Sequence, residues 1–437
     1  MLSNMDANTA AEPLPPEQIQ SQQIQGIKHL KHLLPLFQRL HLVGCQRDKA
    51  HNRKLFFDDY CVLVMLYLFN PLIGALGTLQ QAAGLPNVAK ALGVRRFSMG
   101  SFSEAPAVFD SQQLLPIVRE LGGQVQPLGQ DPRLEQLKEA MTAVDGTVLA
   151  ALPRLAQAAS CGTQYSVARD GKARFGWRLH TQLDLKTLVP HRIDVTGAGN
   201  RGPMRENNVL RAHLEPDLCY INDGGYADAK LFDDIVDAKS SYVCRIREDS
   251  RFEVVEERLL SEQDLAANVV RDVIVQLGAP SAPAMKYPVR LVAVQVQPHP
   301  RRTRKTRQGV VKGTRYSEVL MLATNMLDLP AELVALIYQY RYTVELFFRF
   351  LKHLLGMKHL LSQREEGVKI QTYCALIGCL VISLQIGRKP DKRTVEMMGW
   401  YLLGLASEQD VLDHLNKPDR RGVKLAAKEE LWKKLGV

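Results

Sequence analysis

The spacing of apolar residues divides the chain into a helical N-terminal part, a β-rich middle and a helical C-terminal part. In the N-terminal part, apolar positions recur at helical spacing in three stretches, residues 27–42, 58–76 and 111–123. Gly and Pro break residues 79–105 into short helical segments, in which a helix-turn-helix is one open possibility. The first 24 residues are polar and lack helical spacing, which predicts a disordered tail.

The middle of the chain consists of short β-like runs bounded by Gly, Asp or Asn. Five runs are expected to form strands: 141–152, 177–185, 189–197, 217–226 and 241–249. One helical segment lies between the third and fourth runs, and another lies between the fourth and fifth. Three strands followed by alternating helices and strands predict an α/β fold, in which helices cover a mixed sheet.

Residues 250–325 have the pattern of a β-rich insertion, with strands expected at 268–277, 289–297 and 317–325. The segment 301–316 between the last two strands carries seven Lys or Arg residues and no acid. It is either a hairpin that grips DNA, with steep salt dependence, or a solvated loop. The candidate DNA-contacting residues in it are Arg301, Arg302, Arg304, Lys305 and Arg307. Helical spacing resumes after Pro330 and continues into the C-terminal part.

Composition and charge narrow the class of protein. The 437 residues carry 56 Lys and Arg against 46 Asp and Glu, a net charge of +10 that suits a polyanionic partner. Seven scattered cysteines without a C-x-x-C pair argue against a disulfide framework and a zinc ribbon. The apolar runs are too short for a membrane span, and the N-terminal residues lack the positive charge of a signal peptide. We therefore expect a cytoplasmic chain with no membrane partner.

The stretch YQYRYTVELFFRFLKHLLG, residues 338–356, concentrates polar chemistry beside an apolar stripe. On one continuous helix, Tyr338, Arg341, Glu345 and Lys352 would fall within a sector of roughly 60°. The neighbouring arc is apolar and is expected to face the core. Two readings stay open: Arg341 and Glu345 form an ordinary i, i+4 ion pair on a solvated face, or the sector is a functional surface.

Three carboxylates stand out by their position. Asp145 lies inside an apolar strand, Asp223 closes another strand before a Gly-Gly turn, and Glu345 is on the aromatic helix. Taken singly, each aspartate is more often a turn former or a satisfied surface group. Two adjacent strand ends and a crossing helix could instead bring the three together, where their repulsion would favour divalent cations. Two Mg²⁺ ions, or Mn²⁺ in their place, would then support in-line phosphoryl displacement.

Together these residues resemble a known family. The spacing Tyr338-x₂-Arg341-x₃-Glu345-x₆-Lys352 is similar to the Y-R-E-K signature of bacterial insertion-sequence DDE transposases of the cut-and-paste kind. The segments AVDGT and INDGGY are similar to those that hold the family's first and second catalytic aspartates. Two positions depart from the family pattern: Tyr342 stands where Trp is frequent, and Arg178 stands where Lys is more usual.

The resemblance implies a ribonuclease-H-like catalytic core with a β-rich insertion before the glutamate-bearing helix. It implies that Asp145, Asp223 and Glu345 are the catalytic metal ligands. Tyr338, Arg341 and Lys352 would contact DNA, and Tyr342 would keep an aromatic ring for stacking on a displaced base. The implied activity is Mg²⁺-dependent cleavage at transposon ends and transfer of the freed 3′-hydroxyl into target DNA. The implied partners are terminal inverted repeats, target DNA and a second copy of the chain on DNA, and the implied location is the bacterial nucleoid.

This interpretation divides the chain into four parts. Residues 1–24 form the tail, 25–135 a helical DNA-binding region, 136–360 the catalytic domain with its insertion at 250–325, and 361–437 a C-terminal helical region. Two alternatives stay open: a nuclease with the same core that cuts without joining, and a DNA-binding relative whose catalytic site has decayed. The presence of all three carboxylates argues against decay.

Overall fold

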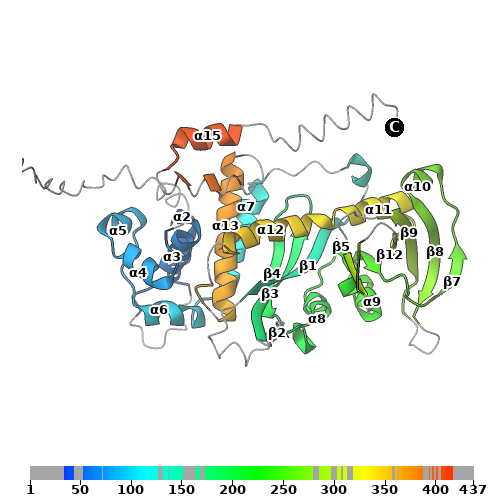
Figure 1. The fold of residues 1–437 in the computed structure, drawn as a ribbon, viewed down its shortest axis with the longest axis horizontal. Helices are drawn as coiled ribbons and strands as arrows, with labels where there is room; N and C mark the ends of the chain where they lie inside the picture. Colours follow the sequence, from blue (N-terminus) through cyan, green and yellow to red (C-terminus); the bar gives the residue numbers. More distant parts are fainter. Residues whose placement is uncertain are drawn as a thin grey trace, which may run out of the picture.

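The computed structural model shows a large sheet with helices on both faces and a group of N-terminal helices at one end (Figure 1). It describes residues 34–43, 53–70, 72–125, 131–135, 137–150, 164–167, 173–278, 285–296, 303–306, 309–312, 318–356, 360–362, 364–386, 393, 396–397, 400–401 and 405–416. The expected tail, residues 1–24, lies outside the described residues. In the part of the chain that is described, no helix is long and apolar enough to cross a bilayer.

The first half of the sheet has the order expected of a ribonuclease-H-like core. Strands β1, β3 and β4 form an antiparallel meander, and β5 and β6 continue the sheet on the other side of β1, parallel to it. The short β2 pairs with the outer part of β3. The bounds are β1 Ala140–Ala150, β2 Gln164–Val167, β3 Ala173–Asp184, β4 Pro190–Gly197, β5 Leu218–Asn222 and β6 Ser241–Ile246.

The strands of the insertion extend this same sheet. Strand β12 pairs with β6, and β9, β8 and β7 follow in that order to the far edge. A separate hairpin, β10 and β11, carries part of the basic segment. The bounds are β7 Phe252–Glu257, β8 Val269–Leu277, β9 Val289–Val296, β10 Thr303–Thr306, β11 Gly309–Lys312 and β12 Glu318–Thr324. The insertion is therefore continuous with the core sheet through the β6–β12 pairing.

Alternation along the strands divides the apolar side chains between two cores. On β5, Cys219 and Ile221 join the core that underlies the C-terminal helices, whereas Leu218 and Tyr220 join the core beneath helix α9. Helices α8, Glu206–Arg211, and α9, Ala229–Asp237, cover this second face. Both faces of the central strands are thus buried, as a mixed sheet with parallel neighbours requires.

The other face of the sheet is covered by three helices in the C-terminal half. Helix α11 lies over β8, β9 and β12, α12 crosses β1, and the long α13 stands between β4 and the N-terminal helices (Figure 1). One apolar cluster runs from the N-terminal helices through α13 to the sheet. The bounds are α10 Glu262–Ala266, α11 Ala331–Gln339, α12 Tyr342–Gly356, α13 Glu365–Ile386 and α15 Glu408–Asn416.

The N-terminal helices pack on α13 through α3 and α7. Helices α4 and α5 are separated by only Gly84 and Leu85, within the segment where a helix-turn-helix was left open. The bounds are α2 Leu34–Gln38, α3 Phe57–Phe69, α4 Leu76–Ala83, α5 Pro86–Leu92, α6 Met99–Glu104 and α7 Leu115–Gln124. The expected helical character of this region is confirmed in the described residues.

The predicted continuous helix from residue 338 is wrong. Helix α11 ends at Gln339, a turn follows at Tyr340 and Arg341, and α12 begins at Tyr342. The apolar stripe of α12 is buried as expected, with Val344, Phe347, Phe348 and Leu351 at most 5% exposed. The helix breaks although neither residue of the turn is Gly or Pro, so no breaker residue marks the end of α11.

Candidate active site

The two aspartates lie at equivalent places on neighbouring parallel strands. The in-register partners on β1 and β5 end with Val144 opposite Asn222, and each of these residues is followed directly by an aspartate. Adjacent strands lie about 4.8 Å apart, so the backbones of Asp145 and Asp223 leave the paired region side by side. The expectation that the two aspartates lie on adjacent strands is confirmed, although only Asp223 follows a strand end, since β1 continues past Asp145 to Ala150.

Local hydrogen bonds hold each aspartate. The Asp145 Oδ1 atom accepts a hydrogen bond from the backbone N–H of Gly146 at 2.7 Å. Asp223 caps the short 3₁₀ turn Gly224–Tyr226, and its Oδ1 atom accepts from the backbone N–H of Gly225 at 2.8 Å. Both carboxylates remain partly open to solvent. Each therefore has an oxygen left for another ligand.

Arg341 joins Asp145 to Glu345. Its Nη2 atom lies 2.5 Å from Glu345 Oε1, and its Nη1 atom lies 3.9 Å from Asp145 Oδ2. The Arg341 side chain is only 16% exposed. The i, i+4 ion pair that the sequence left open does form, but it lies against the β1 aspartate rather than on a solvated face. One guanidinium thus contacts the first-strand aspartate and the helix glutamate at once.

The surroundings of Asp145 disfavour the ionised form of its carboxyl group. Burial, together with the nearby carboxylates of Asp223 and Glu206, raises its pKa to about 6, although the Gly146 N–H and Arg341 act to lower it. Burial and like charge both disfavour the ionised form. A positive charge placed close to Asp145 would stabilise its ionised form.

The other residues of the predicted signature lie around this centre. The Arg341 guanidinium lies 5.9 Å from the centre of the Tyr338 ring, and burial raises the pKa of that phenol to about 12. Burial lowers the pKa of the Lys352 ammonium, while the charge of Asp145 works in the opposite direction, so the two groups are within electrostatic reach. Tyr342, at the start of α12, is 45% exposed.

The predicted basic contacts lie largely outside the described residues. Arg301, Arg302 and Arg307 are not among them, and for Arg304 and Lys305 only the backbone, in β10, is described. The described residues therefore do not test whether the basic segment reaches the candidate site. Its role stays a prediction.

The sequence did not single out Glu206, which the fold brings beside both aspartates. Glu206 is the first residue of α8 and forms an ion pair with Arg178 of β3, where each side chain is 16% exposed. A methyl group built on Gly146 would lie 2.3 Å from Glu206 Oε1, and one on Gly225 would lie 3.8 Å from Glu206 Oε2. An acid in the first turn of a helix is common because it interacts favourably with the helix dipole. The sequence therefore carries no signal that sets Glu206 apart from an ordinary helix start.

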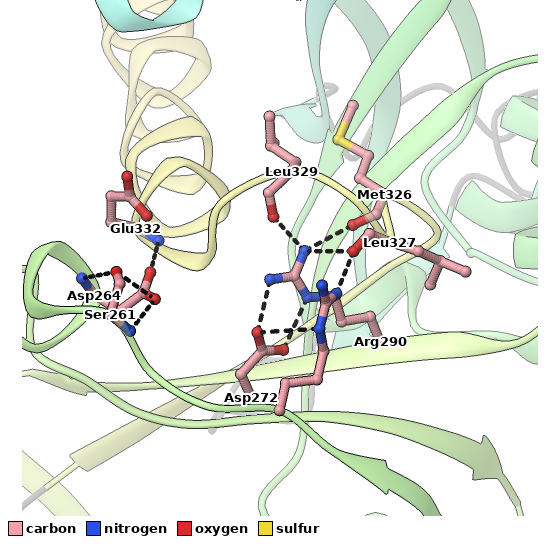
Figure 2. A network of polar contacts seen from close by, with 9 residues as sticks. Ser261, Asp264, Asp272, Arg290, Met326, Leu327, Leu329 and Glu332 are labelled. Atoms are coloured by element: carbon pink, nitrogen blue, oxygen red, sulfur yellow. Dashed lines mark hydrogen bonds and ion pairs between the residues drawn. The ribbon is translucent and has the colours of Figure 1, made fainter.

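A buried network in the insertion anchors the segment that leads to this site (Figure 2). Arg290 of β9 is 2% exposed and binds both oxygens of Asp272 of β8, at 2.8 and 2.7 Å. Its Nη1 atom also donates to the backbone carbonyls of Met326, Leu327 and Leu329. These carbonyls belong to the turn between β12 and α11, so the ion pair fixes where α11 begins.

A second contact holds the start of α11. The Asp264 Oδ1 atom accepts a hydrogen bond from the backbone N–H of Glu332 at 2.9 Å, and Asp264 Oδ2 is bound by Ser261 (Figure 2). Helix α11 leads directly into the turn that carries Arg341. The insertion therefore positions the Arg341–Glu345 pair from a distance.

The chemistry of these donors suits a hard divalent cation. Carboxylate oxygens are the ligands that Mg²⁺ and Mn²⁺ prefer, and mutual repulsion makes their neutralisation favourable. In the structure Glu345 is paired with Arg341 and Glu206 with Arg178. Within the residues described, no group of three or more His, Cys, Asp or Glu is arranged so that it could hold a metal ion. Arg341 and Arg178 instead neutralise the charges of Glu345 and Glu206.

The strand order and the paired aspartates define the class of domain. It is ribonuclease-H-like, with a carboxylate site at the point where the pairing of its central strands β1 and β5 ends. A model of the transposase DDE domain family matches residues 137–381, which is more than half of the 437 residues. The chain therefore belongs to the transposase DDE domain family.

Two curated proteins are similar to this chain. A Sinorhizobium fredii protein named as a transposase is 25% identical over 217 residues, which are 49% of this chain and 54% of that protein. A transposase named for an insertion sequence element of Geobacillus stearothermophilus is 22% identical over 211 residues, 48% of this chain and 49% of that protein. The chain thus spans about half the length of the curated relatives it matches.

Among solved structures, a piggyBac transposase synaptic complex with hairpin DNA aligns with 91% of this chain and 86% of its own, at 11% identity and a TM-score of 0.38. A TM-score at this level does not establish a shared fold. The fold assignment rests instead on the strand order and on the family match.

Proposed function

We propose that the chain is a DNA transposase that binds element ends, cleaves phosphodiester bonds and transfers the freed 3′-hydroxyl ends into target DNA. The observation that carries this proposal is the in-register placement of Asp145 and Asp223, with Arg341 reaching Asp145 while it is paired with Glu345. Membership of the transposase DDE domain family supports the same activity.

Asp145, Asp223 and Glu345 are the residues we propose to hold two Mg²⁺ ions, with Mn²⁺ as a possible substitute. Such a pair of ions, when bound, activates the attacking oxygen and stabilises the leaving oxygen of an in-line displacement. Burial, and after it the charge of Asp223 and Glu206, raises the pKa of Asp145, and a bound cation would relieve this cost of ionisation. Glu345 would exchange its Arg341 partner for this role.

The remaining signature residues would bind and orient the DNA strand. Arg341, freed from Glu345, and Lys352 would each hold a phosphate, since a guanidinium and an ammonium both favour phosphate oxygens. The buried Tyr338 phenol stays protonated at neutral pH and can donate a hydrogen bond. Tyr342 has an exposed ring on which a base could stack.

The proposed partners follow from the reaction. The basic segment 301–307 would hold flanking phosphates, in line with the net charge of +10. Joining two element ends to one target needs two active sites, so we expect two copies of the chain on DNA. Terminal inverted repeats and target DNA are then the substrates.

The test is an excision and integration assay. The purified full chain is incubated with Mg²⁺ and a plasmid that carries the element's terminal repeats, and the products are resolved on a gel and sequenced. Excision and insertion of the element support a transposase. The Asp223→Ala variant should bind the same DNA without cutting it.

Two other outcomes separate the alternatives. Nicking without joining would identify a nuclease with the same core. Binding without cleavage that is unchanged by Asp223→Ala would identify a DNA-binding relative with a decayed site. Either result overturns the transposase proposal.

A further inference from the structure

The break between α11 and α12 coincides with a contact to the segment that precedes β1. The Tyr340 hydroxyl accepts a hydrogen bond from the backbone N–H of Asp131 at 3.2 Å. Tyr340 is the first residue of the turn, and Arg341 is the second. The Tyr340 side chain is also partly buried against the main apolar cluster. The residue next to Arg341 is therefore held both by packing and by its hydroxyl group.

The segment that supplies this N–H is itself held in place. Asp131 caps the short 3₁₀ helix η5, Pro132–Leu134, because its Oδ1 atom accepts a hydrogen bond from the Arg133 N–H at 3.0 Å. The Arg133 guanidinium binds both Asp131 oxygens, at 2.9 and 2.7 Å. Leu134 is 3% exposed within the main apolar cluster, and η5 packs on α11. The N–H of Asp131 is thus a fixed donor for Tyr340.

The backbone of the turn is tighter than that of an α-helix. The N–H groups of Arg341, Thr343 and Val344 each donate to the carbonyl three residues earlier, at 3.0, 2.9 and 3.3 Å. Hydrogen bonds of this kind have poorer geometry than α-helical ones, so long runs of them are uncommon. Neither turn residue is Gly or Pro, so the local sequence does not favour a break over a continuous helix. A contact from outside the turn supplies that preference.

We propose that Tyr340 is a positioning residue, which holds the break between α11 and α12 through Asp131 and so directs Arg341 toward Asp145. This inference rests on the proposed function, because it gives Tyr340 a role in the same reaction. Asp131 lies between α7 and β1 in the chain. The segment that joins the predicted DNA-binding region to the sheet therefore contacts the turn that carries Arg341. Tyr340 acts through Arg341 and does not itself contact DNA or a cation.

The first experiment measures cleavage of plasmid DNA by the full chain in Mg²⁺. Tyr340→Phe removes the hydroxyl and keeps the ring. We expect kcat to fall about tenfold, since one hydrogen bond that orients a reacting group is lost, and KM for DNA to stay unchanged. The matched control is Tyr287→Phe, which removes a hydroxyl bound to Asp237 Oδ1 at 2.7 Å in another part of the chain. This control should cleave as the wild type does.

Amide hydrogen exchange of the full chain, without DNA or cations, measures the turn independently of activity. Loss of the Tyr340 hydrogen bond should speed exchange of the Thr343 and Val344 N–H groups about fivefold. Exchange in β5 and β6 should stay at the wild-type rate. Equal acceleration in the turn and in these strands would assign the hydroxyl to the stability of the whole fold and would overturn the inference. Unchanged exchange in the turn would overturn it as well.

Variants of Asp131 test the contact from the other side. Asp131→Pro removes the N–H donor, and the Asp131 φ of −57° is one that proline adopts. Asp131→Ala removes the carboxylate, keeps the N–H and serves as the reference. Tyr340→Phe should slow cleavage in the Asp131→Ala background and have no further effect in the Asp131→Pro background, because the contact is already lost there. Equal effects in both backgrounds contradict the proposed contact.

The positioning role and the proposed function fail in different ways. If Tyr340→Phe cleaves at the wild-type rate, the positioning role is wrong and the transposase proposal stands. If the wild-type chain itself does not cleave DNA, the proposed function is wrong, and the role of Tyr340 in that reaction fails with it.

Discussion

Val144 and Asn222 are the last in-register partners on the parallel strands β1 and β5. Because each is followed by an aspartate, the pairing register alone sets Asp145 beside Asp223. A slip of one residue would turn one of the two carboxylates to the opposite face of the sheet. The register is held by apolar neighbours on both faces, among them Ala143 on one face and Val144 on the other.

Neutral replacement of either aspartate should abolish cleavage and preserve the fold. Asp145→Asn and Asp223→Asn keep the size of the side chain and remove the charge that would hold a cation. Since a bound metal contributes several kcal/mol to the transition state, we expect cleavage to slow on the order of a thousandfold or more. A nicking assay on plasmid DNA measures the rate, and circular dichroism checks the fold. Cleavage within tenfold of the wild type in both variants would contradict the assignment.

Strand positions were predictable from the sequence because alternation and Gly, Asp or Asn boundaries are local signals. The expected strands at 217–226 and 241–249 correspond to β5 and β6. Strand β7 was missed because FEVVEE lies at the sheet edge, where almost every side chain is exposed and no apolar alternation is needed. An edge strand with acidic side chains does not show the pattern of a buried one.

Part of the site was not predictable from the sequence for a different reason. Asp145 and Asp223 stand out because each interrupts an apolar run. Glu206 does not, since it begins a polar helix, and only the packing of α8 against β3 brings it to Gly146. The turn at Arg341 was also not predictable, because neither Tyr340 nor Arg341 is Gly or Pro.

Arg341 should not be replaceable by lysine. Its two terminal nitrogens reach different carboxylates, Asp145 and Glu345, whereas an ammonium is a single point charge. We expect both Arg341→Lys and Arg341→Ala to lower the cleavage rate about a hundredfold. Arg271→Ala, which removes an exposed arginine paired with Glu257 at the far edge of the sheet, is the control and should cut normally. Full activity in Arg341→Lys would show that charge alone suffices.

Acid should destabilise the chain through His180. Burial, followed by the charge of Arg178, lowers its pKa to about 4, against about 6.5 in an unfolded chain. Between these values the unfolded state binds a proton that the folded state does not, so the free energy of unfolding falls as pH drops through this window. The full shift corresponds to on the order of 3 kcal/mol. Urea unfolding at pH 7.5 and 4.5 should show a smaller decrease for His180→Gln than for the wild type, and equal decreases would exclude His180 as the cause.

The buried pair Arg290 and Asp272 should be essential for placing α11. Arg290→Met leaves Asp272 with only the more distant Arg258 as a partner, at 4.0 Å, and removes the donor to the carbonyls of Met326 and Leu329. We therefore expect a loss of about 3–5 kcal/mol in the free energy of unfolding. The matched control is an exposed ion pair between the neighbouring strands β8 and β7, formed by Arg271 and Glu257. There Arg271→Met should cost less than about 1 kcal/mol.

Replacing both charges, in Arg290→Met/Asp272→Leu, should recover stability relative to Arg290→Met, since no lone charge stays buried. Activity should still be impaired in this double variant because the carbonyls of Met326 and Leu329, before α11, lose their donor Arg290. Normal cleavage by the double variant would show that the insertion stabilises the fold without positioning Arg341 and Glu345.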